Sequence, residues 1–147
     1  MGQSLTDLLY HITFSTEGRA PLIADGIRAR FHGYLVSLIA ELKGQVVAVY
    51  AAPDHVHLLV RLPAAVSVSQ ALRVVKANSS RWAAEIVKGF AWQGGYAAFT
   101  VGHETVETAR QYVENQALHH ARTDYREELL RLFAEHGVDY DDQYLWS

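Results

Sequence analysis

Hydrophobic and polar residues alternate in the segment 8–15, the first part of the chain with a regular pattern. In residues 8–15 the side chains of Tyr10, Ile12 and Phe14 share one side, and polar neighbours share the other. This alternation predicts a half-buried strand, because successive side chains of a strand point to opposite faces. Segments rich in β-branched residues or with the same alternation predict three further strands, at residues 45–52, 55–62 and 96–101.

Longer segments repeat apolar residues every three or four positions, which is the spacing of an amphipathic helix. Ser67, three residues before Gln70, resembles a capping box at the start of one such segment. Gly44 and Gly137 follow two others, at positions where helices commonly end. The pattern predicts helices at residues 22–43, 67–88, 104–121 and 124–136.

The order of these elements is βαββαβ followed by two helices, which predicts a ferredoxin-like α+β fold with an antiparallel sheet. Pro53 and Asp54 form a tight turn, so the strands on either side of it make an antiparallel hairpin. The two crossover helices cover one face of the sheet, and the other face is left for a site beneath a later helix. Without a linker or a repeat, residues 1–147 are expected to form one domain.

The third predicted strand carries two histidines on one face. His55, His57, Leu59 and Arg61 alternate with the apolar residues that face the core. The two imidazoles are about 7 Å apart along the strand, close enough to converge on one cation. Two ligands are too few for a metal site, so at least one more must come from elsewhere in the fold. The alternative is that both are ordinary surface or hydrogen-bonded histidines.

A tyrosine and a glutamine lie one turn apart on the predicted helix 104–121. Tyr112 and Gln116 are four positions apart and share a helix face. A phenol has an unperturbed pKa of about 10 and needs help to act as a nucleophile. A nearby cation bound to a phosphate would supply that help, and the Gln116 amide oxygen could be its third ligand. The alternative is a partly buried aromatic residue beside a solvated glutamine.

Composition and charge narrow the classes of partner. Of the 147 residues, 50% are hydrophobic, and the net charge of −3 argues against nonspecific coating of DNA. There is no cysteine, no signal peptide is evident, and no apolar run is long enough to span a membrane, so we expect a cytoplasmic protein. Acidic side chains gather in the last quarter of the chain, at Glu127, Glu128, Glu135, Asp139, Asp141 and Asp142.

The basic side chains lie earlier and leave room for a nucleic-acid face. Arg73, Lys76 and Arg81 on the helix 67–88 are candidates for contacts with a DNA backbone, or else form a solvated face. Trp92 beside Gly94 and Gly95 could stack on an unpaired base, with packing inside the turn as the alternative. His11 and Thr13 are expected to line the site if the first strand neighbours the histidine strand.

The chain resembles a known family through two motifs. The segment PDHVHLLV (53–60), together with YVENQ (112–116), resembles the single-tyrosine HUH transposases, in which two histidines flank a bulky hydrophobic residue. These are small insertion-sequence transposases that act on single-stranded DNA, and the related transposases associated with repetitive extragenic palindromes. The similarity extends to residues 10–16, 76–82, 92–96 and 144–146.

The resemblance implies a mechanism and a set of site residues. His55 and His57 would bind Mg²⁺ or Mn²⁺ with Gln116 as the third ligand. Tyr112 would be the nucleophile that forms a 5′-phosphotyrosine and releases a 3′-hydroxyl, which later rejoins the strands. The family acts as homodimers on hairpins near element ends, and the tyrosine helix of one subunit often completes the other's site.

Other functions remain compatible with the motifs. One is a domesticated protein that binds DNA hairpins without cutting them, although all four motif residues are present. Another is a two-histidine phosphoesterase, which is disfavoured because the sequence has only one His-x-His motif. His120, four residues after Gln116, could approach the metal or the phosphate but is interpreted as a surface residue of the helix.

Overall fold

The computed structural model describes residues 2–116, 124–143 and 145, and in them a four-stranded antiparallel sheet. The strand order is β2-β3-β1-β4, as expected for a ferredoxin-like βαββαβ chain. The predicted fold class is therefore confirmed. The strands are β1 (Leu9–Ser15), β2 (Gln45–Ala51), β3 (His55–Arg61) and β4 (Ala97–Val101).

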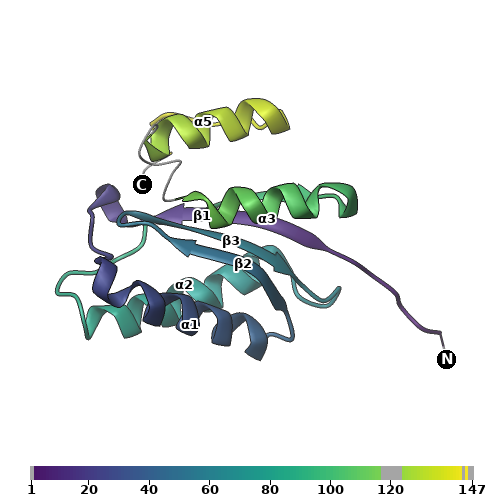
Figure 1. Ribbon diagram of the computed structural model, residues 1–147, viewed down its shortest axis with the longest axis horizontal. Coiled ribbons are helices and arrows are strands. Elements are labelled where there is room, and N and C mark those ends of the chain that lie inside the picture. The colour runs from purple at the N-terminus through teal and green to yellow at the C-terminus, as the bar shows by residue number, and fades with distance from the viewer. Residues whose placement is uncertain (1, 117–123, 144, 146–147) are drawn as a thin grey trace.

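Helices cover both faces of this sheet. Figure 1 shows α1 and α2 on one side, and α3 and α5 on the other. No helix in the part of the chain that the structure describes has the length and apolar composition needed to cross a bilayer. The helices are α1 (Asp25–Glu41), α2 (Val68–Ala84), α3 (Val106–Glu114) and α5 (Tyr125–His136), with short 3-10 turns at Glu17–Arg19 and His103–Thr105.

The main core lies between the sheet and the pair α1 and α2. Alternate residues of β1 and β3, such as Phe14 and Leu58, point into it and are fully buried. Phe31 of α1 and Leu72 of α2 pack against them from the helical side. This is the face that the sequence pattern assigned to the core. The polar residues of the same strands must therefore face α3 and α5.

The register of β1 and β3 aligns those polar residues in two facing rows. Ser15 pairs with His55 and Thr13 pairs with His57, so both histidines lie opposite residues of β1. β1 is the central partner of both β3 and β4, which confirms that it neighbours the histidine strand. Side chains of β1 therefore reach the histidines directly.

Most helix ends agree with the predictions within a few residues. The exception is α3, which ends at Glu114 and not at the predicted residue 121, so that Gln116 follows its C-cap Asn115. Ser67 caps α2 by accepting a hydrogen bond from the Gln70 backbone N–H at 3.1 Å. At the end of α1 the positive φ of 66° belongs to Lys43 rather than to Gly44. Gly44 is required for another reason, because a Cβ there would lie 2.9 Å from the Arg61 carbonyl oxygen.

Candidate metal and tyrosine site

His55 and His57 lie on the sheet face that α3 and α5 cover. Both side chains are almost completely buried. Aromatic side chains from the helices close over them, since the His55 ring stacks on Tyr125 with ring centroids 4.1 Å apart. The sequence pattern placed the two imidazoles on a shared open face, and the structure shows that later helices enclose that face.

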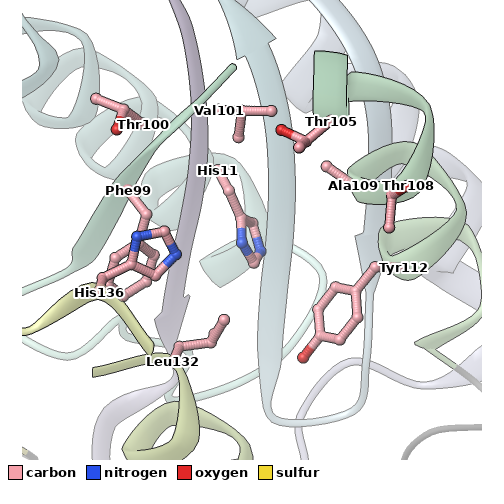
Figure 2. A pocket seen from close by; sticks show the side chains of 10 residues that line it. All are labelled: His11, Phe99, Thr100, Val101, Thr105, Thr108, Ala109, Tyr112, Leu132 and His136. Carbon is pink, nitrogen blue, oxygen red and sulfur yellow. The ribbon is translucent and has the colours of Figure 1, made fainter. Parts of the chain in front are cut away.

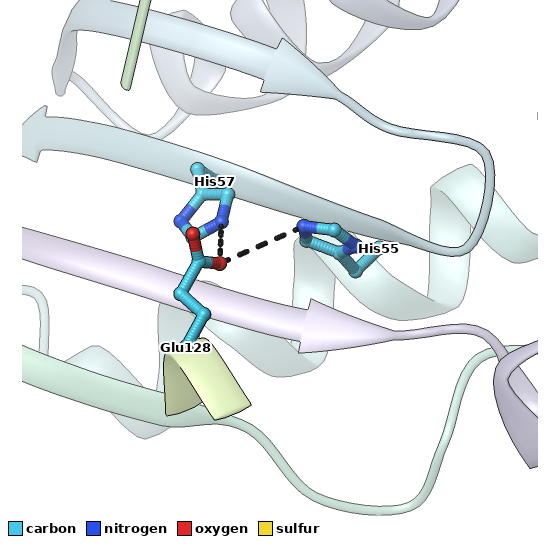
Figure 3. A group of neighbouring side chains, drawn as sticks. All are labelled: His55, His57 and Glu128. Carbon is cyan, nitrogen blue, oxygen red and sulfur yellow. Dashed lines mark hydrogen bonds and ion pairs between the residues drawn. The ribbon is translucent and has the colours of Figure 1, made fainter. Parts of the chain in front are cut away.

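A third potential ligand enters from α5. The Oε1 atom of Glu128 lies 2.8 Å from Nε2 of His57 and 3.8 Å from Nε2 of His55. Figure 3 shows the carboxylate extending from its helix toward both rings. One donor atom from each of the three residues lies within 4.8 Å of the others. These atoms converge closely enough to hold one cation between them.

The sequence analysis missed Glu128 because it was grouped with the acidic side chains of the last quarter of the chain. A signal was available in the spacing of α5. Glu128 lies three residues after Tyr125 and four before Leu132, so it occupies the apolar stripe of an amphipathic helix. A carboxylate at such a position must be paired or ligating, because an isolated buried charge is costly.

The donor set suits a divalent cation. Imidazole nitrogens bind transition metals, whereas carboxylate oxygens bind both these metals and Mg²⁺. Two imidazoles and one carboxylate therefore fit Mn²⁺ well and accommodate Mg²⁺. The fit follows from the chemistry of these buried side chains.

Each imidazole is also held through its second nitrogen. Nδ1 of His55 lies 2.6 Å from Oδ1 of Asp54, the residue that precedes it in the turn. Nδ1 of His57 lies 2.8 Å from Nε2 of His11 on β1, and the two rings stack with centroids 5.1 Å apart. Both rings therefore present Nε2 to Glu128 and use Nδ1 for orientation.

Two side chains of β1 line the site, as the sequence suggested. Burial, followed by the charge of neighbouring His57, lowers the pKa of His11 to about 3. Thr13 donates to the Val56 carbonyl at 2.8 Å, and its hydroxyl lies 3.0 Å from the Tyr125 hydroxyl. Thr13 therefore links β1 to both the histidine strand and α5.

Tyr112 approaches the same group of side chains from α3. Its ring meets the edge of His57 with centroids 6.0 Å apart and that of His11 at 5.8 Å. Burial raises its pKa, and the charge of Glu128 and a hydrogen bond to it raise it further, against opposing effects of Gln116 and Arg131. The predicted nucleophile and the histidines therefore meet at one site within a single chain.

Gln116 is fully buried beside Tyr112. Its amide nitrogen donates to the Tyr112 carbonyl at 3.1 Å, one helical turn earlier. The side chain is therefore inside the protein rather than solvated. Its proposed role as a metal ligand stays a prediction.

A cavity of about 220 Å³ opens next to Tyr112. Figure 2 shows Phe99 and His136 on one side of the His11 ring and Tyr112 on the other. Phe99 and His136 stack with centroids 4.5 Å apart. This hollow leaves the Tyr112 side chain accessible to a ligand from outside.

The residues predicted to contact DNA lie away from the histidines and Tyr112, and each has a different environment. They are Arg73, Lys76, Arg81 and Trp92. Lys76 donates to the carbonyls of Gln93 and Gly95 at 2.7 Å each, and burial lowers its pKa. Arg73 is exposed and lines a second hollow, of about 380 Å³, together with Lys76. Arg81 donates to the side chain of Asn78.

Trp92 belongs to the main core. It is 8% exposed, and its indole N–H donates to the Ser79 hydroxyl at 2.9 Å. Its ring contacts Phe14 edge to face with centroids 4.8 Å apart. The alternative of packing inside the fold describes its position better than base stacking does. His120 lies outside the described residues, as do the tail residues Tyr144 and Trp146.

Comparison with known proteins identifies relatives of the fold. A candidate transposase of Deinococcus radiodurans R1 has a TM-score of 0.64 and 24% identity, over 79% of this chain and 96% of that one. A REP-associated tyrosine transposase bound to a REP hairpin has a TM-score of 0.62 and 15% identity, over 84% of this chain and 76% of that one. A search of curated proteins gave no match.

The sequence itself carries the family assignment. A family model described as IS200-like transposase matches residues 4–116, which include both histidines, Tyr112 and Gln116. This range covers more than half of the 147 residues. The chain belongs to the IS200-like transposase family.

Proposed function

We propose that this protein cuts and rejoins single-stranded DNA through a 5′-phosphotyrosine on Tyr112, with the help of a divalent cation. One observation carries the proposal. The Tyr112 ring meets His57 edge to face with centroids 6.0 Å apart, and the carboxylate of Glu128 contacts Nε2 of both His55 and His57. A nucleophile and three metal-binding side chains thus share one buried site.

His55, His57 and Glu128 would hold Mn²⁺ or Mg²⁺, with Gln116 as a further ligand. A cation bound there would polarise the scissile phosphate and stabilise the charge that develops on it. The nearly complete burial of the two imidazoles and the carboxylate excludes water and strengthens these electrostatic interactions.

Tyr112 would attack the scissile phosphorus. The new bond joins the phenolic oxygen to phosphorus, and the bond from phosphorus to the 3′-oxygen breaks. The leaving oxygen takes up one proton, which balances the proton that Tyr112 loses, and becomes a 3′-hydroxyl. The phenolic proton has an acceptor in the Glu128 carboxylate, whose charge acts on the pKa of Tyr112. In the rejoining step a 3′-hydroxyl attacks the phosphotyrosine and Tyr112 recovers its proton, so no external energy source is needed.

The DNA partner proposed is a single strand with hairpins that mark the ends of an element. A similar fold is seen bound to a REP hairpin in the tyrosine transposase compared above. On this chain the hollow beside Arg73 and Lys76 offers positive charge for phosphate contacts, despite the acidic net charge. The family resemblance further supports a homodimer that works in the cytoplasm.

The test is formation of a covalent protein–DNA adduct. Labelled single strands that carry the hairpins flanking the gene are incubated with the protein and Mn²⁺ and then separated under denaturing conditions. We expect an adduct in which peptide mass spectrometry identifies phosphotyrosine at position 112. Tyr112→Phe should abolish it and preserve hairpin binding, and Tyr34→Phe, on α1 at the opposite face of the sheet, serves as the matched control.

The alternative function is hairpin binding without cleavage. It predicts tight binding of the same strands with no adduct at any concentration of Mn²⁺ or Mg²⁺. The presence of Tyr112, His55, His57 and Glu128 in one site favours the enzyme, because a protein that only binds DNA needs no buried group of this kind. A bound hairpin that never yields an adduct would establish the alternative.

A further inference from the structure

We propose that His11 is a positioning residue that fixes His57 in the tautomer needed to bind the cation. The inference rests on the proposed function, because it concerns the same metal site. It assigns a role to a buried histidine of β1 that lies outside the two family motifs.

The contact between the two histidines is direct. Nε2 of His11 lies 2.8 Å from Nδ1 of His57, and both side chains are buried. The His11 ring stacks on His57 and meets Tyr112 edge to face at 5.8 Å and Phe99 at 6.1 Å. These aromatic neighbours on three sides restrict rotation of the ring, so Nε2 of His11 is held against His57.

The two nitrogens of His57 face different partners. Nε2 lies 2.8 Å from Glu128, and Nδ1 faces His11. A metal on Nε2 needs the lone pair of that atom, so in a neutral imidazole the hydrogen must be on Nδ1. A buried N–H requires an acceptor, and the Nε2 atom of a neutral His11 occupies that place. His11 therefore stabilises the form of His57 that can bind a cation.

His55 has the equivalent arrangement with a different partner. Its Nδ1 lies 2.6 Å from the carboxylate of Asp54. Metal-binding histidines commonly donate their second N–H to a carboxylate or another acceptor, which fixes ring orientation. The site thus has one imidazole oriented by a charged group and one oriented by a neutral ring, and His11 completes the pair.

The first test compares two substitutions of His11 by titration calorimetry with Mn²⁺ in the absence of DNA. His11→Phe keeps a ring but removes the acceptor, and we expect affinity to fall about 10- to 100-fold. His11→Gln offers an amide oxygen to the His57 N–H and should retain most of the affinity. His32→Phe is the matched control, since His32 accepts a backbone N–H from Ala51 on the opposite face of the sheet.

The outcomes separate this inference from the proposed function. If the wild-type protein binds no Mn²⁺, the metal site itself is wrong. If the wild type binds Mn²⁺ and His11→Phe binds it equally well, the metal site stands and the role of His11 is overturned. Equal losses in His11→Phe and His11→Gln would also overturn it, because they would show that the lost contact is not a hydrogen bond.

A second measurement needs no variant and covers the case in which His11→Phe does not fold. Nitrogen-15 NMR of the imidazoles, recorded on the wild-type protein saturated with diamagnetic Mg²⁺, reports which nitrogen carries hydrogen. We expect His57 to carry it on Nδ1 and His11 to have an unprotonated Nε2. An unprotonated Nδ1 on His57 would overturn the proposal.

Discussion

Oε1 of Glu128 lies 2.8 Å from Nε2 of His57, although 71 positions separate the two residues in the chain. The contact joins α5 to the histidine strand and places a carboxylate next to the hydroxyl of Tyr112. It makes Glu128 the residue on which both halves of the proposed chemistry depend, because metal binding and acceptance of the phenolic proton need the same group.

Replacing Glu128 by Gln should therefore impair catalysis much more than recognition. The substitution keeps the size of the side chain but removes its charge and its capacity to accept the proton. We expect adduct formation to slow by about 100-fold or more, with hairpin affinity unchanged. Glu127→Gln, at an exposed position on the same helix, is the control. Adduct formation at the wild-type rate in Glu128→Gln would show that the carboxylate has no part in the reaction.

Gln116→Ala tests the ligand that the family resemblance implies. If the amide oxygen binds the cation, the substitution should reduce metal-dependent cleavage about 10-fold or more while hairpin binding is kept. Single-turnover rates at several Mn²⁺ concentrations and gel-shift affinities measure the two effects. Gln111→Ala, exposed on α3 next to Tyr112, controls for general effects on that helix. An equal decrease in binding and cleavage would contradict a role as a ligand.

The choice of cation follows from the donor atoms. Two imidazoles and a carboxylate favour Mn²⁺ over Mg²⁺, because Mg²⁺ prefers oxygen ligands and retains its waters. We expect calorimetry to show tighter binding of Mn²⁺ than of Mg²⁺, and adduct formation to need a lower concentration of Mn²⁺. Tighter binding of Mg²⁺ would mean that oxygen ligands other than Glu128 dominate the site.

Arg73 and Lys76 should behave differently although they line one hollow. Arg73→Ala should weaken hairpin binding and reduce its salt dependence by about one phosphate contact, with thermal stability unchanged. Lys76→Ala should lower the free energy of unfolding by about 1 kcal/mol, since its ammonium holds two carbonyls of the 93–95 loop. Urea unfolding and binding at several salt concentrations distinguish them, and a stable Lys76→Ala protein would contradict the structural role.

His32 gives a pH dependence that can be measured apart from the site. Burial, and secondarily the charge of Arg28, lowers its pKa below 6.5. The unfolded chain therefore takes up the proton first, and the stability due to neutral His32 is complete above pH 6.5 and lost as the pH falls below it. His32→Gln keeps an acceptor for the Ala51 N–H but does not titrate. Its melting temperature should fall less than that of the wild type between pH 7 and 5.

Local patterns predicted most of the fold. The alternation in residues 55–62 assigned each side chain of β3 to the correct face, and the helical spacing located α1, α2, α5 and the start of α3 to within a few residues. Local patterns did not predict the role of Gly44. A helix end was expected there, but the glycine is required by its close approach to Arg61, a contact that only the folded sheet creates.

The site was predicted only in part, because some of its contacts exist only in the folded protein. The spacing of His55 and His57 follows directly from the sequence, and so does that of Tyr112 and Gln116. The association of Glu128 with them depends on how α5 packs over the sheet, which no local pattern specifies. His11 was placed near the site from strand order, and its contact with His57 required the register of β1 against β3.

The boundary of the family match gives the position of Glu128 a further meaning. The match ends at residue 116, whereas the carboxylate is on α5, beyond it. The histidines and the tyrosine therefore lie within the matched range, and the carboxylate that we propose as a ligand lies outside it. Exchanging α5 between family members should change cation preference while the nucleophile and the histidine strand stay as they are.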